Sequence, residues 1–238
     1  MSSGDIFRMS ALAFVSLPRI LLSTLFIIIV LVVLLAGGAN RYSKQVMVQE
    51  KPDRVLLAWS GPVEAPMRDQ IAGALDQYRN DKRRLIISLN SPGGSVAHGR
   101  EVTKAILLAG NLRQIETFVD KDAICASMCV PIYLVGATRI ADPKARFMFH
   151  EASMAIPGLD RIDRIDRTYR EEITSRVKNL EHRMTDDIFL SDLDAPRVAT
   201  DWRVQMRRKI AGRDIWLTGK QLMEQNSGVV DSLVFSSR

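Results

Sequence analysis

The sequence predicts an α/β domain made of βαβ units around a mainly parallel sheet, preceded by one N-terminal transmembrane helix. Past residue 53, short aliphatic runs alternate with segments whose apolar residues recur every three or four positions. This alternation is typical of parallel sheets covered by helices. Before it, residues 20–40 contain no charged side chain. With 238 residues and 47% hydrophobic content, the chain is long enough to bury one sizeable core.

The uncharged segment has the length of a membrane span. Its 21 residues extend about 30 Å as a helix, which matches the bilayer core. The apolar stretch is longer than that of most secretory signals, so we expect an uncleaved anchor over residues 20–40, after a tail of residues 1–19. Basic residues flank the segment on both sides, which leaves the positive-inside rule undecided. Because a single N-terminal helix most often exports the bulk of the chain after it, we expect the domain on the extracytoplasmic (periplasmic) side.

Residues 41–52 form the expected linker, and residues 53–238 form the expected globular domain. Continuous apolar runs such as Val55–Trp59 and Leu85–Leu89 have the length of buried strands. The predicted elements run in this order: a strand at 53–60, a helix at 66–80, a strand at 85–89, a helix at 99–109, a strand at 114–119, a small-residue helix beginning near Cys125, short strands at 139–140 and 146–149, a helix at 219–225 and a strand at 229–235.

One long amphipathic helix is predicted over residues 160–187. Its apolar residues are spaced three or four positions apart: Ile162, Ile165, Tyr169, Ile173, Val177, Leu180 and Met184. The other face carries nearly balanced charges, as a surface facing solvent or another subunit would. The apolar stripe packs either on the domain core or against another subunit, and the pattern alone does not choose.

The cysteines and the net charge give no sign of a metal site or a nucleic-acid partner. Cys125 and Cys129 would lie one turn apart on the expected helix, where side-chain directions rarely suit a disulfide, so we expect buried free thiols. Two cysteines are too few ligands for a metal. The basic residues behind the net charge of +6 are dispersed, without a nucleic-acid-binding motif. Attraction to anionic lipid beside the membrane helix accounts for them better.

Ser127 and His150 have the residue types of a serine hydrolase. Ser127 is a lone hydroxyl in an apolar, small-residue stretch, and serine needs a neighbouring base to act as a nucleophile. The chain has three histidines. His150 ends a predicted buried strand, whereas His98 lies in a glycine turn and His182 lies off the apolar stripe of the long helix. This favours His150 as the base. An isolated serine at such a place would more often be a small residue that allows close packing.

A glycine-containing turn precedes this region, at residues 90–95. Gly93 and Gly94 tolerate backbone dihedrals that aim N–H groups at a substrate oxygen. The N–H of Met128, directly after Ser127, has the position of a second donor. Taken alone, the turn is also consistent with a tight strand-to-helix connection.

Four motifs occur in a fixed order: Leu89-Asn-Ser-Pro-Gly-Gly94, Ala126-Ser127-Met128, Phe149-His150, and a C-terminal region with Arg213-Asp214-Ile-Trp-Leu and Gly228-Val-Val-Asp-Ser-Leu233. Together they resemble the proteolytic subunit of the Clp protease, within the Clp protease/crotonase superfamily, from about Val55 to Val234. The resemblance implies stacked βαβ units with residues 160–187 as a protruding handle-like helix. It also implies a serine-type endopeptidase that acts on peptides or proteins and forms a homo-oligomer, without cofactor or metal.

The resemblance also assigns roles to residues. Ser127 corresponds to the nucleophile, His150 to the general base and Asp214 to the carboxylate that orients the base. The backbone N–H groups of Gly94 and Met128 correspond to the oxyanion hole. The substrate-binding loop corresponds to Ser91, Pro92, Gly93 and Ser95. On the residues alone, Asp192, Asp194 and Asp201 compete with Asp214, because a triad aspartate is recognised by geometry.

The chain departs from this family pattern in several places. Glu151 and Ala152 stand where the family has glutamine and proline. A membrane segment replaces the soluble N-terminal region, which argues against docking to an ATP-driven unfoldase. Membrane-anchored relatives such as signal peptide peptidase A use a serine–lysine pair, but Lys121 precedes Ser127 too closely to be assigned that role. Two other functions stay open: a crotonase-like acyl-thioester-binding protein, and a non-catalytic oligomeric scaffold.

Overall fold

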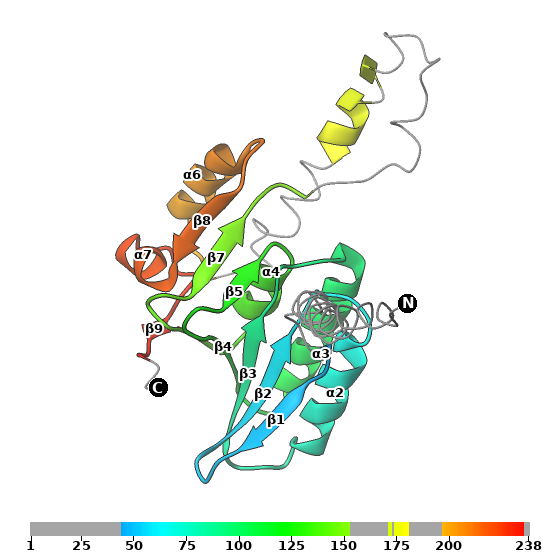
Figure 1. Cartoon of the computed structure of the whole chain (residues 1–238), viewed down its shortest axis with the longest axis vertical. Helices are drawn as coiled ribbons and strands as arrows, with labels where there is room; N and C mark the ends of the chain where they lie inside the picture. Colours follow the sequence, from blue (N-terminus) through cyan, green and yellow to red (C-terminus); the bar gives the residue numbers. More distant parts are fainter. Residues whose placement is uncertain (1–43, 153–170, 173, 181–196, 236–238) are drawn as a thin grey trace, which may run out of the picture. The chain divides into compact units, whose positions relative to one another are not determined.

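Two sheets form the framework of the described chain (Figure 1). The computed structural model describes residues 44–152, 171–172, 174–180 and 197–235, all within one compact unit spanning residues 42–238. The larger sheet has the strand order β1-β2-β3-β4-β6-β9, and the smaller has the order β5-β7-β8. The strands are β1 (Met47–Glu50), β2 (Arg54–Ser60), β3 (Arg84–Asn90), β4 (Ile115–Val119), β5 (Ile124–Ala126), β6 (Thr138–Ala141), β7 (Arg146–Phe149), β8 (Ile215–Thr218) and β9 (Ser232–Leu233).

Parallel pairing dominates the larger sheet. Strands β2, β3, β4, β6 and β9 pair in parallel, and only β1 runs antiparallel, against β2. Helix α2 (Met67–Gln77) connects β2 to β3, and helix α3 (Val96–Gly110) connects β3 to β4. These are the βαβ units that the alternation of apolar runs predicted, so the expected mixed α/β architecture is confirmed.

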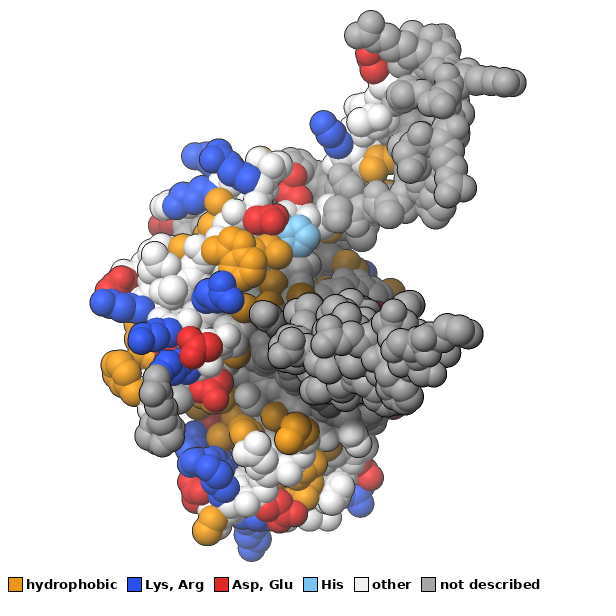
Figure 2. All heavy atoms as spheres, viewed as in Figure 1, with side chains coloured by type: hydrophobic (Ala, Val, Ile, Leu, Met, Phe, Trp, Pro, Cys, Tyr) orange, Lys and Arg blue, Asp and Glu red, His pale blue; other side chains and the backbone are white. Residues whose placement is uncertain are grey.

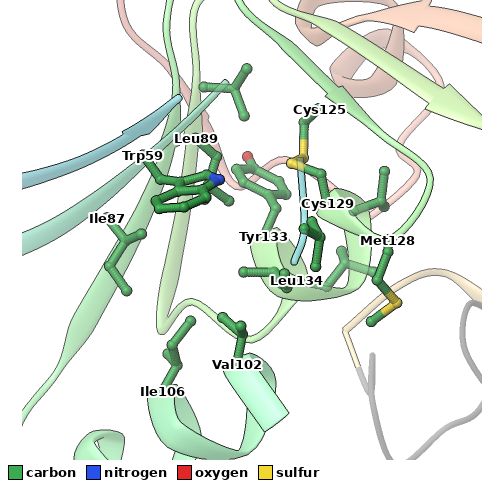
Figure 3. Close-up of a cluster of buried hydrophobic side chains, with 14 of the residues drawn as sticks. Trp59, Ile87, Leu89, Val102, Ile106, Cys125, Met128, Cys129, Tyr133 and Leu134 are labelled. Carbon is green, nitrogen blue, oxygen red and sulfur yellow. A yellow bond between two sulfur atoms is a disulfide. The ribbon is translucent and has the colours of Figure 1, made fainter. Parts of the chain in front are cut away.

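A layer of apolar side chains fills the space between the larger sheet and its helices (Figure 3). Ile87 from β3 and Ile106 from α3 are almost completely buried. Burying a side chain of this size contributes about 1.5–3 kcal/mol. Helix α4 (Cys129–Leu134) adds Tyr133, whose hydroxyl is buried and has no hydrogen-bond partner among the described residues. Burial raises the pKa of Tyr133 well above its usual value, so this side chain stays neutral in the core.

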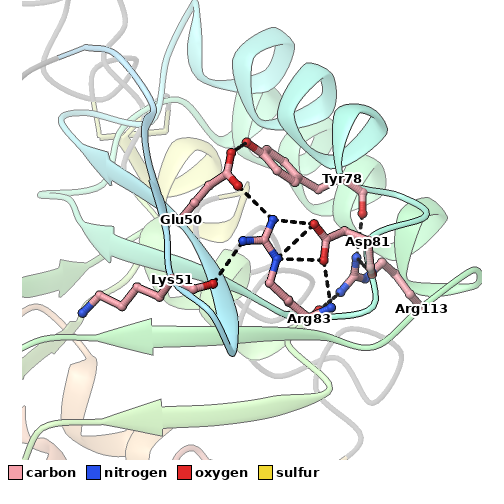
Figure 4. A network of polar contacts seen from close by, with 6 residues as sticks. All are labelled: Glu50, Lys51, Tyr78, Asp81, Arg83 and Arg113. Atoms are coloured by element: carbon pink, nitrogen blue, oxygen red, sulfur yellow. Dashed lines mark hydrogen bonds and ion pairs between the residues drawn. The ribbon is translucent and has the colours of Figure 1, made fainter.

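A network of polar contacts lies at the end of the larger sheet where β3 begins (Figure 4). The Arg83 guanidinium donates to Glu50 Oε2 at 2.9 Å and to Asp81 Oδ2 at 2.6 Å. Arg113 donates to the main-chain oxygens of Tyr78 and Asp81 at 2.6 and 2.5 Å. The hydrogen bonds from Arg83 lower the pKa of Asp81 to about 2. The network therefore fastens β1 and the end of α2 to the start of β3.

The region around Cys125 differs from the expectation. A helix was predicted to begin near Cys125, but residues 124–126 form β5, which pairs in parallel with β7, and α4 begins only at Cys129. The segment that suggested a helix instead forms a short strand, which pairs with β7 and bridges to Ser91 on its other side. Helix α6 (Thr200–Ile210), strand β8 and strand β1 were not anticipated, whereas helix α7 (Gly219–Glu224) was. Strand β1 lies inside the segment expected to be a linker.

Two predicted helices fall wholly or mostly outside the described residues. The expected membrane segment, residues 20–40, lies outside them, and among the described residues no helix has the length and apolar character needed to cross a membrane. Of the expected helix over residues 160–187, residues 171–172 and 174–180 are described and are helical. Leu180 on its apolar stripe is 39% exposed.

Over the described part of the face seen in Figure 2, Lys and Arg side chains are interspersed with Asp and Glu.

Candidate active site

Ser127 lies at the turn between β5 and α4. Its φ is +52°, which is uncommon for a residue other than glycine. The Ser127 N–H donates to the main-chain oxygen of Met148 at 3.0 Å. The main-chain oxygen of Ser127 accepts from the Val130 N–H at 2.9 Å. The first bond continues the pairing of β5 with β7, and the second starts the helical turn. Ser127 is therefore held where the chain leaves the sheet and enters the helix.

His150 comes directly after β7, at the same end of the smaller sheet as Ser127. Strands β5 and β7 are parallel, so Ser127 and His150 both stand at carboxyl ends of neighbouring strands. Strand β8 pairs antiparallel with β7, and the pair next to this end is Phe149 with Ile215. His150 directly follows Phe149 and Asp214 directly precedes Ile215, so both residues come just beyond this last pair.

Strand topology thus brings the three predicted residues Ser127, His150 and Asp214 to one end of the smaller sheet. A side-chain contact on β7 and β8 is consistent with this register: the Arg146 guanidinium lies 5.6 Å from the centre of the Trp216 ring. Glu151 Oε2 accepts from the Gly212 N–H at 3.2 Å, which holds the loop before Asp214 against the end of β7. Within the described residues no hydrogen bond links the three side chains.

The loop after β3 lies against the turn that carries Ser127. The Ser91 N–H donates to the main-chain oxygen of Ile124 at 2.8 Å, and the main-chain oxygen of Ser91 accepts from the Ala126 N–H at 3.0 Å. Asn90 Oδ1 accepts from the Ile124 N–H at 3.1 Å. These bonds form a seam that joins the larger sheet, through β3, to the smaller sheet, through β5. Ser91 is fully buried and its Oγ accepts from the Gly93 N–H, whereas Pro92 is exposed.

Gly93 approaches Ser127 too closely for any side chain. Its φ is +91°, and a Cβ built on it would lie 2.6 Å from Ser127 Cβ and 3.2 Å from the Met128 nitrogen. Gly94 has a φ of +154°, and a Cβ there would lie 2.6 Å from the Val63 oxygen. Val63 clamps this loop, because its N–H donates to the Gly93 oxygen and its oxygen accepts from the Ser95 N–H. No sequence signal had marked Val63.

The two predicted oxyanion donors lie on these adjoining loops. Among the described residues, neither the Gly94 N–H nor the Met128 N–H donates a hydrogen bond. Gly94 is an exposed residue. Ser95 has another task in the loop: its Oγ accepts from the His98 N–H at 3.2 Å and caps the start of α3.

A groove of about 410 Å³ adjoins Met128. The Met128 side chain packs on Gly99 of α3, where a Cβ would overlap its Cγ. From there the groove runs between α3 and α4. It is lined by Arg100, Thr103, Lys104, Leu107, Leu108, Asn111, Met128 and Pro131. The groove therefore combines apolar walls with the basic side chains of Arg100 and Lys104. Met128, which directly follows Ser127 in the sequence, is part of its lining.

The competing residues are placed less favourably or are not described. His98 lies in the first turn of α3 rather than in the glycine turn, and its Nε2 accepts from the Arg68 N–H at 3.2 Å. Lys121 precedes β5, whereas Ser127 comes after it, so the two residues stand at opposite ends of that strand. Asp201 lies in the first turn of α6. His182, Asp192 and Asp194 lie outside the described residues.

The prediction of free thiols at Cys125 and Cys129 is wrong. The two residues form a disulfide, with their Cα atoms 5.1 Å apart. The prediction assumed one continuous helix, but Cys125 lies on a strand and Cys129 opens a helix. The reversal at Ser127 turns the two side chains toward each other, beside Tyr133 (Figure 3). Among the described residues there is no cluster of three or more His, Cys, Asp or Glu side chains that could hold a metal ion.

Comparison with known proteins identifies the family of the chain. No curated protein matches the chain significantly. A sequence model of the family described as Clp protease matches residues 53–236. This match covers the larger sheet apart from β1, the whole smaller sheet and the loops that carry the candidate residues. Since it spans well over half of the sequence, the chain belongs to the Clp protease family.

Proposed function

We propose that the chain is a serine endopeptidase that hydrolyses peptide bonds through an acyl-enzyme on Ser127. Family membership implies a serine-type peptidase in general. The observation that carries the specific assignment is the register of the smaller sheet. Ser127 and His150 follow neighbouring parallel strands, and Asp214 directly precedes the antiparallel strand β8, so all three residues belong to the same end of the smaller sheet. Asp201 has no comparable position, because it lies at the start of α6.

In the proposed reaction, Ser127 Oγ attacks the carbonyl carbon of the scissile bond while His150 accepts its proton. The Asp214 carboxylate orients the imidazole and stabilises its charged form. The negative charge on the carbonyl oxygen is stabilised by the Gly94 and Met128 N–H groups. Each such donor is worth about 3 kcal/mol of barrier height. His150 then gives its proton to the leaving amine, and a water molecule releases the acyl group by the reverse sequence.

The groove beside Met128 is the proposed site for substrate side chains. Its apolar walls, including Leu107 and Leu108, suit nonpolar residues of a peptide. Family members bind protein substrates and usually form oligomers, so a protein substrate and a homo-oligomer are proposed here too.

We further propose that residues 20–40 anchor the enzyme in a membrane with its catalytic domain on the extracytoplasmic side. The uncharged, bilayer-length segment supports the anchor. The Cys125–Cys129 disulfide supports the side, because disulfides persist in oxidising compartments and are rare in the cytosol. Reporter fusions at the C-terminus test this: a reporter active only after export should be active, and activity of a cytosolic reporter would contradict the orientation.

Fluorophosphonate labelling tests the catalytic proposal. The wild-type chain should form a covalent adduct on Ser127, identified by mass spectrometry of the peptide, and Ser127→Ala should not. Ser232→Ala, in β9 at the far edge of the larger sheet, is the matched control and should label like wild type. Equal labelling of wild type and Ser127→Ala refutes the proposal. Saturable acyl-CoA binding without a serine adduct would identify a thioester-binding protein instead.

A further inference from the structure

The Cys125–Cys129 disulfide spans the proposed nucleophile. Cys125 lies on β5, two residues before Ser127, and Cys129 begins α4, two residues after it. The covalent ring therefore contains both Ser127 and Met128, the nucleophile and one proposed oxyanion donor. Both cysteines are almost completely buried, at 0% and 1% exposure, and they belong to the main apolar cluster (Figure 3).

The turn inside this ring needs restraint. Ser127 has a φ of +52°, a conformation that a residue other than glycine keeps only when its surroundings enforce it. On either side the chain is anchored in different elements: Cys125 pairs with Phe147 of β7, and Cys129 belongs to a helix. Apart from the disulfide, the turn is held by the hydrogen bonds of Ser127 to Met148 and Val130, which connect it to β7 and to α4 separately.

The ring is poorly suited to stabilise the protein as a whole. The two cysteines are four positions apart in sequence, and closing so short a loop restricts the unfolded chain less than closing a long one. A short ring mainly fixes the local path of the backbone. Its location around Ser127 indicates that local geometry, rather than global stability, is what the bond supplies.

We infer that the Cys125–Cys129 disulfide is a positioning element for catalysis, which holds Ser127 and the Met128 N–H in the geometry that the reaction needs. The inference rests on the proposed peptidase function. With the bond intact, strand β5 and helix α4 are fixed across the turn. When it is reduced, two separate thiols need more room in the packed core than the bonded pair, and the turn shifts. Substrate binding in the groove beyond Met128 depends less on this turn than the chemical step does.

Reduction of the full-length protein tests the inference directly, because the chain has only two cysteines. A phosphine reductant converts the disulfide to two thiols and is itself oxidised, and thiol alkylation with mass analysis verifies the conversion. We expect the maximal rate of fluorophosphonate labelling to fall at least about tenfold, with little change in the probe concentration for half-maximal rate, since a displacement below about 1 Å already costs this much. The Cys125→Ala/Cys129→Ala variant should label slowly with or without reductant.

A second measurement does not need activity. Amide hydrogen exchange of the segment 123–134 should become faster on reduction, in the wild type and equally in Ser127→Ala, while exchange in strand β3 stays the same. If the verified reduced protein labels as fast as the oxidised one, or if exchange of the segment is unchanged, the inference is overturned. If the oxidised wild type never labels, the peptidase proposal fails on its own, and the exchange measurement still decides whether the bond holds the turn.

Discussion

Replacing Gly93 by alanine should slow the proposed reaction of Ser127 strongly without unfolding the protein. The added Cβ would lie 2.6 Å from Ser127 Cβ, whereas ordinary contact begins at 3.4 Å, so one of the two must move by about 0.8 Å. The Ala126 oxygen at 2.7 Å and the Met128 nitrogen at 3.2 Å leave little room on the other sides. The displacement therefore falls on the turn that carries Ser127.

This geometry has two separate effects. Holding alanine at a φ of +91° should cost about 1–3 kcal/mol of stability. A misplacement of nearly 1 Å at a reacting group costs about 100-fold in rate. Gly73→Ala is the matched control: Gly73 lies within α2, and nothing lies within 4 Å of a Cβ built there. That variant should gain up to about 1 kcal/mol of stability, because alanine favours helix over glycine, and keep full activity.

Labelling rates with a fluorophosphonate, together with urea unfolding, separate the two effects. Gly93→Ala should label about 100-fold more slowly under conditions where its circular dichroism and unfolding transition show a folded protein. If it labels within about twofold of wild type, the close contact between Gly93 and Ser127 does not control the nucleophile, and the reasoning from this geometry is refuted.

Two further predictions concern carboxylates. Asp214→Asn should lower the labelling rate on the order of 10⁴-fold, as loss of a triad carboxylate does, whereas Asp201→Asn should stay within about twofold; the reverse order would move the role to Asp201. Asp81→Asn should lower the thermal midpoint near pH 6, because the hydrogen bonds from Arg83 hold the pKa of Asp81 at about 2, below its unfolded value of about 3.9. A carboxylate with a lowered pKa stabilises the fold above its unfolded pKa, so the difference from wild type should shrink between about pH 4 and pH 2. A difference that is independent of pH down to about pH 2 would contradict this origin.

Strands β2 and β3 of the larger sheet were predictable because they contain continuous apolar runs. Val55–Trp59 and Leu85–Leu89 lie in neighbouring parallel strands; burial is continuous over residues 85–87 of β3, whereas it alternates along β2. The smaller sheet was harder to predict. Its strand β5 has only three residues, Ile124–Ala126, which are too few to show a strand periodicity. Its strand identity comes from pairing with β7 and Ser91, which are distant in sequence.

The candidate site shows the same division between local and distant information. Ser127 and His150 were identifiable from residue type and their position at the ends of apolar runs. The disulfide was not, because its geometry depends on the backbone reversal at Ser127. The position of Asp214 at this end of the sheet depends on strand β8, which the periodicity did not reveal, so only the family resemblance had selected it. Val63 contributes through its backbone alone, and no residue type marks such a role.

The seam at Asn90 and Ser91 divides the proposed catalytic machinery between two bodies of structure. Gly94 is supplied by the larger sheet, whereas Ser127, His150 and Asp214 are supplied by the smaller one. A small slide of one sheet along the other would therefore leave the triad intact and withdraw one half of the oxyanion hole. Variants at the seam would bind the same substrates and form the same adduct more slowly, so their defect would appear in the rate of acylation even though none of the reacting groups had been changed.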